Sequence, residues 1–250
     1  MLDHPTKVIV NADDFGYSPG VSTGILYAHQ FGLVTSTTVM VNTKFAKQGI
    51  EMAEWFPDLG MGLHFVLDIG RPVSSSASSL IDHTTGFFLK GKALIQSAMK
   101  DDIKKELEAQ LKRLYEWGVN VTHIDSHHHM HTHIPAAWEV VTEVARQYKL
   151  PIRSLDQNDM TKGILTNNYF IKEFYGEENI FPSSLIQILS NLNSGVTEIM
   201  SHPAFIDPWL QNGSSYNLPR MKELETLVND QIQVWVKNHN IDLIHYGDMK

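Results

Sequence analysis

Short apolar segments alternate with longer segments of helical periodicity from one end of the chain to the other. Seven segments have the pattern of β-strands: residues 8–11, 36–41, 62–66, 121–126, 152–154, 197–201 and 241–246. Between most of them, apolar residues recur every three or four positions, as they do along residues 103–114 and 221–235. Strands that alternate with helices predict a mainly parallel sheet, because each helix carries the chain back to begin the next strand in the same direction.

Seven strands in 250 residues predict a single α/β domain over residues 1–250. The expected architecture is a β/α barrel that is irregular or short of eight strands. A doubly wound sheet is the alternative, but its dinucleotide-binding form fits poorly, because the first strand runs into Asp13-Asp14-Phe15-Gly16 and not into a glycine-rich phosphate turn. The long connection at residues 68–100 is expected to pass over the barrel mouth; a disordered surface insertion is the alternative.

The composition excludes several classes of function. With 42% hydrophobic and 19% charged residues, the chain resembles an ordinary soluble globular protein. Its net charge of −8 argues against a protein that binds the nucleic-acid backbone. The absence of cysteine excludes disulfides, thiolate metal ligands and cysteine nucleophiles. No early segment resembles a signal peptide, and no segment approaches the length of a membrane span. We therefore expect a cytoplasmic, soluble protein without nucleic-acid or membrane partners.

Histidine is the residue type that stands out. The chain has 13, and six of them fall within eleven residues: His123, His127, His128, His129, His131 and His133. An expression tag does not fit, because the cluster is internal and follows a strand-like segment. A solvated polar loop is the remaining neutral interpretation. We expect a metal-binding or catalytic role for at least one of the six.

Polar residues gather at the predicted carboxyl ends of the strands, where β/α barrels carry their functional groups. In chain order these positions hold Asp13, Asp14, His64, Asp125, His127, Arg153, His202, His245 and Asp248. Most other strand positions are apolar. A single aspartate there often caps the next helix, and a single histidine is often a core residue. Their joint occurrence predicts one functional site.

Asp14, His64 and His127 form a set of two histidines and one carboxylate from three different strands. This set suits a catalytic divalent metal and leaves room for water and substrate. Successive residues of an extended chain point in opposite directions. We therefore expect Asp14 to bind the metal, and Asp13 to face the attacking water and take a proton from it.

The other polar residues receive supporting roles. Within the histidine cluster His127 is preferred as ligand because it follows the strand directly; His129 is the second choice, and His128 is expected to point away. Asp125 is placed to orient a ligand histidine. His131 and His133 either line the mouth or are solvated.

Two further residues are candidates for the chemistry. His202, in Ser201-His202-Pro203, is expected to lie opposite the aspartates in a closed barrel and to donate a proton to the leaving group. Arg153 is expected to pair with Asp13 and keep it ionised.

These residues resemble those of the YdjC-like (ChbG-type) carbohydrate deacetylases, which include chitooligosaccharide deacetylases. The resemblance rests on five stretches that span nearly the whole chain: residues 8–16, 35–38, 62–65, 122–129 and 201–203. The double aspartate at 13–14 and the Asp-Ser-His-His-His motif at 125–129 are specific when they occur together.

The resemblance implies a distorted β/α barrel related to NodB-type polysaccharide deacetylases, and a homodimer. It implies one divalent metal ion, usually magnesium, on the positions of His64 and His127 with Asp14 as carboxylate ligand, and Asp13 as catalytic base. The implied substrates are acetylated chitooligosaccharides such as diacetylchitobiose, sometimes phosphorylated disaccharides. By ligand softness alone, two histidines and one carboxylate favour zinc.

The predicted activity is therefore metal-dependent N-deacetylation with release of acetate. Three alternative functions fit the residues less well. A glycosidase needs two carboxyl groups about 5–9.5 Å apart, and adjacent Asp13 and Asp14 fit that poorly. A metal-dependent sugar-phosphate hydrolase, such as a cellobiose-phosphate cleavage enzyme or a phosphoesterase, would need more basic residues than the evident Arg71 and Arg153. Metal storage by the histidine cluster would leave His202 unexplained.

Overall fold

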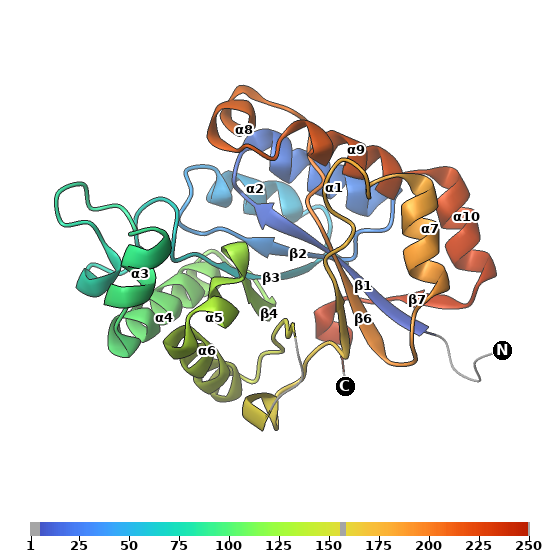
Figure 1. The fold of residues 1–250 in the computed structure, drawn as a ribbon. Coiled ribbons are helices and arrows are strands. Elements are labelled where there is room, and N and C mark those ends of the chain that lie inside the picture. The colour runs from blue at the N-terminus through green and yellow to red at the C-terminus, as the bar shows by residue number, and fades with distance from the viewer. Residues whose placement is uncertain (1–5, 156–158, 250) are drawn as a thin grey trace.

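The computed structural model describes residues 6–155 and 159–249 as an all-parallel sheet surrounded by helices (Figure 1). Every pairing between its strands is parallel, in the order β4-β3-β2-β1-β6-β5 with β7 beside β1. The strands are β1 Thr6–Phe15, β2 Ser36–Val39, β3 Gly60–Phe65, β4 Val121–Ser126, β5 Tyr169–Ile171, β6 Val196–Ser201 and β7 Ile241–Leu243.

Strand β1 lies at the centre of the sheet, and all of its residues except Lys7 are buried. Strand β6 pairs with β1 along one edge, over Lys7 to Ala12. Along the other edge of β1, its first residues pair with β7 and its last residues pair with β2. Single bridges from Ile124 to Ile152 and from Ile152 to Thr166 connect the β4 side with the segment that leads into β5. The result is the predicted distorted barrel of seven parallel strands.

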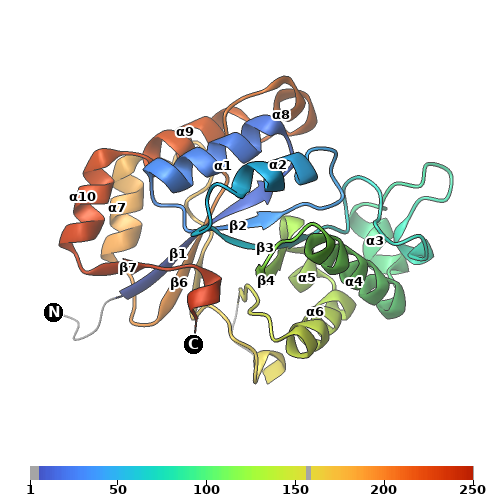
Figure 2. The same cartoon turned by 180° about the vertical axis from the view of Figure 1, so that it is seen from behind.

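Helices cover the outside of the sheet (Figures 1 and 2). α1, α2, α8 and α9 lie along one side, and α4, α5 and α6 along another. The helices are α1 Pro19–Phe31, α2 Ala46–Ala53, α3 Gly91–Ser97, α4 Lys100–Glu116, α5 Met130–His133, α6 Pro135–Tyr148, α7 Pro182–Ser190, α8 Pro208–Gly213, α9 Leu218–Leu227 and α10 Asp230–Asn238. Within the described ranges, none is long and apolar enough to cross a membrane.

Three predicted elements were wrong in detail. Residues 152–154 form only the bridge at Ile152, and the strand beside β6 is β5, which has three residues and no clear apolar alternation. The last strand ends at Leu243 and not at residue 246. The apolar stripe over residues 221–235 belongs to two helices, α9 and α10, because the Asn229 side chain caps a new helix and interrupts the first.

The connection at residues 68–100 has structure of its own. It contains the 3₁₀ turn Ser78–Leu80, a bridge between Ile81 and Phe88, and α3. The buried Glu106 carboxylate of α4 accepts hydrogen bonds from the backbone N–H groups of Val73 and Ser74 at 2.8 Å each. The segment is therefore packed against α4, and two of its residues, Ile69 and Lys90, line the pocket described next.

Candidate active site

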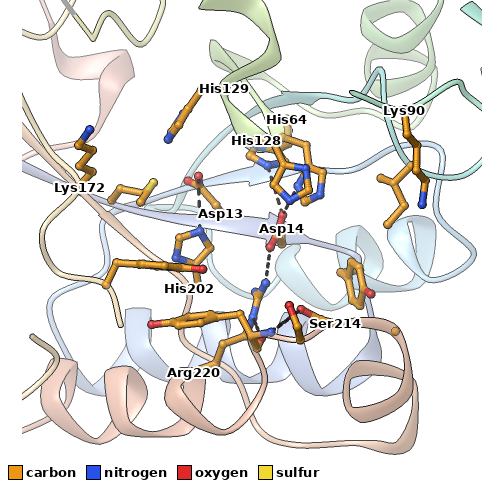
Figure 3. Close-up of a pocket in the computed structure, with 18 residues that line it drawn as sticks. Asp13, Asp14, His64, Lys90, His128, His129, Lys172, His202, Ser214 and Arg220 are labelled. Carbon is orange, nitrogen blue, oxygen red and sulfur yellow. Dashed lines mark hydrogen bonds and ion pairs between the residues drawn. The ribbon is translucent and has the colours of Figure 1, made fainter. Parts of the chain in front are cut away.

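A cavity of about 580 Å³ opens at the carboxyl ends of the strands (Figure 3). Its lining comes from the ends of β1, β3, β4 and β6 and from the loops around α8 and α9. The polar lining residues are Asp13, Asp14, Tyr17, His64, Lys90, His127, His128, His129, Lys172, Tyr175, His202, Ser214, Ser215, Tyr216 and Arg220. Six residues were predicted to bind the metal or to take part in catalysis. Five of them line this cavity, and Arg153 does not.

Asp14, His64 and His127 converge on one point. The Asp14 Oδ1 atom lies 3.2 Å from His64 Nε2 and 3.0 Å from His127 Nδ1. One ligand atom from each of the three residues lies within 4.8 Å of the other two. All three residues are buried. The structure thus brings the predicted ligand set together.

A hydrogen bond behind His64 fixes the orientation of its ring. His64 Nδ1 lies 2.7 Å from Asp125 Oδ1 and 3.0 Å from the Thr38 hydroxyl, so that Nε2 faces Asp14. Asp125 holds this predicted orienting position. Although burial lowers the pKa of His64, the Asp125 and Asp14 carboxylates outweigh it and raise the pKa to about 10.

Asp13 and Asp14 both reach the cavity, which simple strand alternation does not allow. The backbone of Asp14 adopts a left-handed conformation with φ 70°, and the register between β1 and β2 shifts between Ala12 and Phe15. This bulge turns the Asp14 side chain toward the same pocket as Asp13. The expectation that the two carboxylates point in opposite directions was therefore wrong.

Arg153 lies fully buried among three carboxylates. Its Nη1 and Nη2 donate to the two oxygens of Asp13 at 2.8 and 2.7 Å, which is the predicted ion pair in bidentate form. The guanidinium also lies 2.9 Å from Asp125 Oδ2 and 2.6 Å from Glu198 Oε1. Burial raises the pKa of Asp13, but Arg153 outweighs it and holds the pKa below its usual range.

His202 lies directly after β6 and beside Asp13. Ala12 pairs with Ser201 across β1 and β6, so the residues that follow them, Asp13 and His202, are neighbours. His202 Nε2 lies 4.0 Å from Asp13 Oδ2 (Figure 3). Its predicted position opposite the aspartates was wrong, because the pairing of β1 with β6 could not be predicted from the order of the strands along the chain. Burial and the Arg220 guanidinium lower the pKa of His202 to about 4.

The histidine cluster divides into several environments. His128 does not point away: it lines the cavity, with Nδ1 2.6 Å from Asp68 Oδ2, because residues 127–129 form a 3₁₀ turn and not an extended strand. His129 also lines the cavity, and burial lowers its pKa to about 3. His131 neither lines the mouth nor is solvated, because it is buried and hydrogen-bonded to Ser126. His133 is exposed.

His245 and Asp248 lie away from the cavity. Strand β7 pairs with the first residues of β1, at the opposite end from Asp13. Consequently His245 packs against Gly60, the first residue of β3. The prediction that these two residues join the strand-end site was wrong, because the strand order was unknown.

Two charged residues of α9 belong to the site and were missed. Arg220 donates to Asp14 Oδ2 at 2.6 Å, and Glu223 hydrogen-bonds the backbone N–H of His202. Burial raises the pKa of Glu223 to about 8. The available signal was helical spacing: Arg220, Glu223, Leu224 and Leu227 share one buried face of α9. Two charges on an apolar face indicate a buried polar role.

The arrangement combines a cluster that can bind a cation, a carboxylate beside it and a histidine next to that carboxylate. A family 4 carbohydrate esterase from Streptomyces lividans, in complex with acetate, has the same fold with a TM-score of 0.52 at 12% identity, covering 97% of this chain and 92% of its own. The fold is therefore that of the distorted β/α barrels related to NodB-type polysaccharide deacetylases.

Closer relatives define the family. A family model described as YdjC-like protein matches residues 7–238. A carbohydrate deacetylase of Clostridium beijerinckii is 39% identical over 97% of this chain and 100% of its own length. A chitooligosaccharide deacetylase of Proteus mirabilis is 36% identical over 97% of this chain and 98% of its own. The chain belongs to the YdjC-like family.

A solved structure from Enterococcus faecalis is also similar over its whole length. Its TM-score is 0.90 at 32% identity, covering 97% of this chain and 98% of the other. The name of that protein refers to cellobiose-phosphate cleavage.

Replacing Arg153 tests its role in holding the site together. Arg153→Met leaves Asp13, Asp125 and Glu198 buried without their counter-ion, so we expect the free energy of unfolding at pH 7 to fall by about 3–5 kcal/mol. Urea denaturation measures the change. Arg71→Met, at an exposed position, is the control and should stay within about 0.5 kcal/mol of the wild type. An Arg153→Met protein as stable as the control would contradict this role.

Proposed function

We propose that this protein is a metal-dependent hydrolase that removes acetyl groups from N-acetylated carbohydrates and releases acetate. The observation that carries the proposal is the convergence of Asp14, His64 and His127 in a cavity that also holds Asp13 and His202. Relatives named carbohydrate deacetylase and chitooligosaccharide deacetylase match nearly the full chain, which supports the same class of reaction.

One divalent cation fits the cluster of Asp14, His64 and His127. The donors are one carboxylate and two imidazoles, and Asp125 orients the His64 ring as metal-binding histidines commonly require. Arg220 holds the second oxygen of Asp14, whereas the first faces His64 and His127, where a cation would replace its hydrogen bond with His127. Ligand softness favours zinc, whereas the resemblance implies magnesium. Elemental analysis of protein purified without added metal distinguishes them.

The residues around the cluster can perform amide hydrolysis. A bound divalent cation would polarise the acetyl carbonyl, stabilise the charge that develops on its oxygen and lower the pKa of a water molecule. Asp13 takes a proton from the attacking water, and its ion pair with Arg153 keeps it ionised before that step. His202 gives a proton to the departing nitrogen. Acetate and a free amino sugar result.

The inferred substrates are short chitooligosaccharides such as diacetylchitobiose. Lys90 and Lys172 stand on opposite sides of the cavity (Figure 3). These two cations favour a phosphorylated disaccharide over a neutral one. Tyr175 and Tyr216, stacked at 4.1 Å between ring centroids, add an aromatic surface. The homodimer and the cytoplasmic location stay predictions.

A sugar-phosphate hydrolase is the second candidate. It is favoured by the name of the Enterococcus faecalis relative and by the two rim lysines. Hydrolysis of phosphate esters often uses two metal ions about 3.5–4 Å apart. Two other groups among the described residues could hold a cation, Asp68 with His127 and His128, and Asp13 with His64 and Asp125, and each shares one histidine with the first group. These shared ligands make a two-metal site a poorer fit than a single metal.

The deciding experiment measures acetate. The protein is stripped of metal by a chelator and incubated with N-acetylglucosamine oligomers, with and without a phosphate group, before and after Mg²⁺ or Zn²⁺ is restored. We expect acetate only after metal is restored. Inorganic phosphate or cleaved sugar in place of acetate would support the rival activities. Acetate release that survives complete chelation would refute metal dependence.

Substituting Asp13 tests the catalytic base. Asp13→Asn keeps the shape of the side chain but removes its capacity to accept a proton. We expect kcat for acetate release to fall by about 10²–10⁴-fold, while the metal content measured by elemental analysis stays at one per chain. The exposed Asp82→Asn is the control. Near-wild-type release by Asp13→Asn would remove Asp13 from this role.

Two histidine variants test the metal site. His64→Ala removes one ligand, so we expect its metal content after dialysis to fall well below that of the wild type. His133→Ala removes an exposed histidine of the cluster and should retain the metal. Equal loss in both variants would mean that the histidine-rich segment binds metal unspecifically.

A further inference from the structure

His202 has two ring nitrogens with different surroundings. Nε2 faces the cavity and lies 4.0 Å from Asp13 Oδ2. Nδ1 is buried, lies 3.9 Å from Glu223 Oε1 and has no hydrogen-bond partner within residues 6–155 and 159–249. The rings of Tyr175 and Tyr216 pack edge-on against the imidazole at centroid distances of 5.5 and 5.9 Å. The ring is thus confined between the cavity and Glu223.

Glu223 is a fully buried carboxyl group with fixed partners. The Tyr216 hydroxyl donates to Oε1 at 2.6 Å, and the backbone N–H of His202 donates to Oε2. Among the described residues, the one basic side chain within 4.0 Å of its oxygens is His202. Arg220, one turn earlier on α9, directs its guanidinium to Asp14 instead. In the part of the chain that the structure describes, no arginine or lysine forms an ion pair with Glu223 as Arg153 does with Asp13, although the charge of Arg220 acts on Glu223 without a direct contact and lowers its pKa.

This environment favours the uncharged form of both groups at neutral pH. Burial raises the pKa of Glu223 to about 8, and burial with Arg220 lowers the pKa of His202 to about 4. The other titratable or charged groups that act on Glu223 are Tyr216 and Arg220, which lower its pKa, and Asp13, which raises it. Those that act on His202 are Asp13, Asp14 and Arg153. A carboxylic acid beside a neutral histidine with an unprotonated Nδ1 can donate a hydrogen bond to that nitrogen. The 3.9 Å between Nδ1 and Oε1 is longer than a hydrogen bond, so the two side chains must approach by about 1 Å before the acid donates.

We propose that Glu223 donates its proton toward Nδ1 of His202 and thereby keeps the proton of the neutral imidazole on Nε2, facing the substrate. Glu223 is then a positioning residue that makes His202 a proton donor without requiring an imidazolium ion. This inference rests on the proposed deacetylase function for its catalytic consequence. The tautomer of His202 can be measured without it.

The proton transfers form a closed cycle. When the carbon–nitrogen bond of the tetrahedral intermediate breaks, the Nε2 proton passes to the departing nitrogen, Nδ1 accepts the Glu223 proton, and Glu223 becomes a carboxylate. Asp13 holds the proton that it took from water and lies 4.0 Å from Nε2. Return of that proton to Nε2, and of the Nδ1 proton to Glu223, restores both groups.

Nitrogen NMR of ¹⁵N-histidine-labelled protein with its metal restored reads the tautomer directly. The His202 signals are assigned by their loss in His202→Asn. We expect Nε2–H at pH 7 and a shift toward Nδ1–H above about pH 8, as Glu223 ionises. Nδ1–H at pH 7 would overturn the proposal. Because this measurement needs no turnover, it decides the Glu223–His202 pairing even if the protein releases no acetate.

Kinetics test the catalytic consequence. Glu223→Gln can still donate a hydrogen bond to Nδ1 but cannot supply a proton, so we expect kcat for acetate release to fall about 100-fold, with little change in KM. The wild type should lose activity above about pH 8, and this alkaline limb should vanish in Glu223→Gln. Glu225→Gln, at an exposed position of the same helix, should match the wild type.

Tyr216→Phe provides a second variant in case Glu223→Gln folds poorly. The Tyr216 hydroxyl of the wild type lowers the pKa of Glu223 through its hydrogen bond. Loss of this hydroxyl should therefore move the alkaline limb of the activity profile to higher pH. A limb that stays in place in both variants would overturn the proton-supply role while leaving the deacetylase assignment intact.

Discussion

The site depends on the ion pairs that the buried guanidinium of Arg153 forms with three carboxylates. A charge in the interior is tolerated only when it is paired and hydrogen-bonded. Here its partners Asp13, Asp125 and Glu198 come from β1, β4 and β6. Strand β4 is separated from β1 by two strands in the sheet, so Arg153 connects distant parts of the curved sheet through its interior. The same contacts that satisfy Arg153 also fix Asp13 toward the cavity and Asp125 behind His64.

Two arginines distinguish two adjacent aspartates. Arg153 grips both oxygens of Asp13, whereas Arg220 holds one oxygen of Asp14 and leaves the other near His64 and His127. A carboxylate with one oxygen directed at two imidazoles is suited to a cation. A carboxylate held from behind by a guanidinium is ionised and available to a proton donor in the cavity. Identical side chains thus obtain different chemistry from their partners.

The sequence was most informative where a position follows from the strand itself. Asp14, His64 and His127 could be predicted to meet, because carboxyl ends of parallel strands share one edge. The order of the strands could not be predicted, and the mistaken placements of His202 and His245 both follow from that. Local irregularities of the backbone could not be predicted either. The bulge at Asp14 and the left-handed backbone of His128 change where their side chains point. Neither residue is a glycine, which is the residue type that predicts a left-handed conformation.

Helix α9 contributes two ionisable groups to the site that the pattern of strands could not predict. Arg220 and Glu223 are three residues apart, so one face of the helix presents both toward the ends of β1 and β6. Arg220 donates to Asp14, the proposed metal ligand, and Glu223 lies beside His202, the proposed proton donor. Arg220 is paired with Asp14 and only partly offsets the burial of Glu223, so the pKa of Glu223 is raised to about 8. In the proposed reaction the strands supply the reacting groups, and this helix supplies the carboxyl group that would set the protonation state of the proton donor.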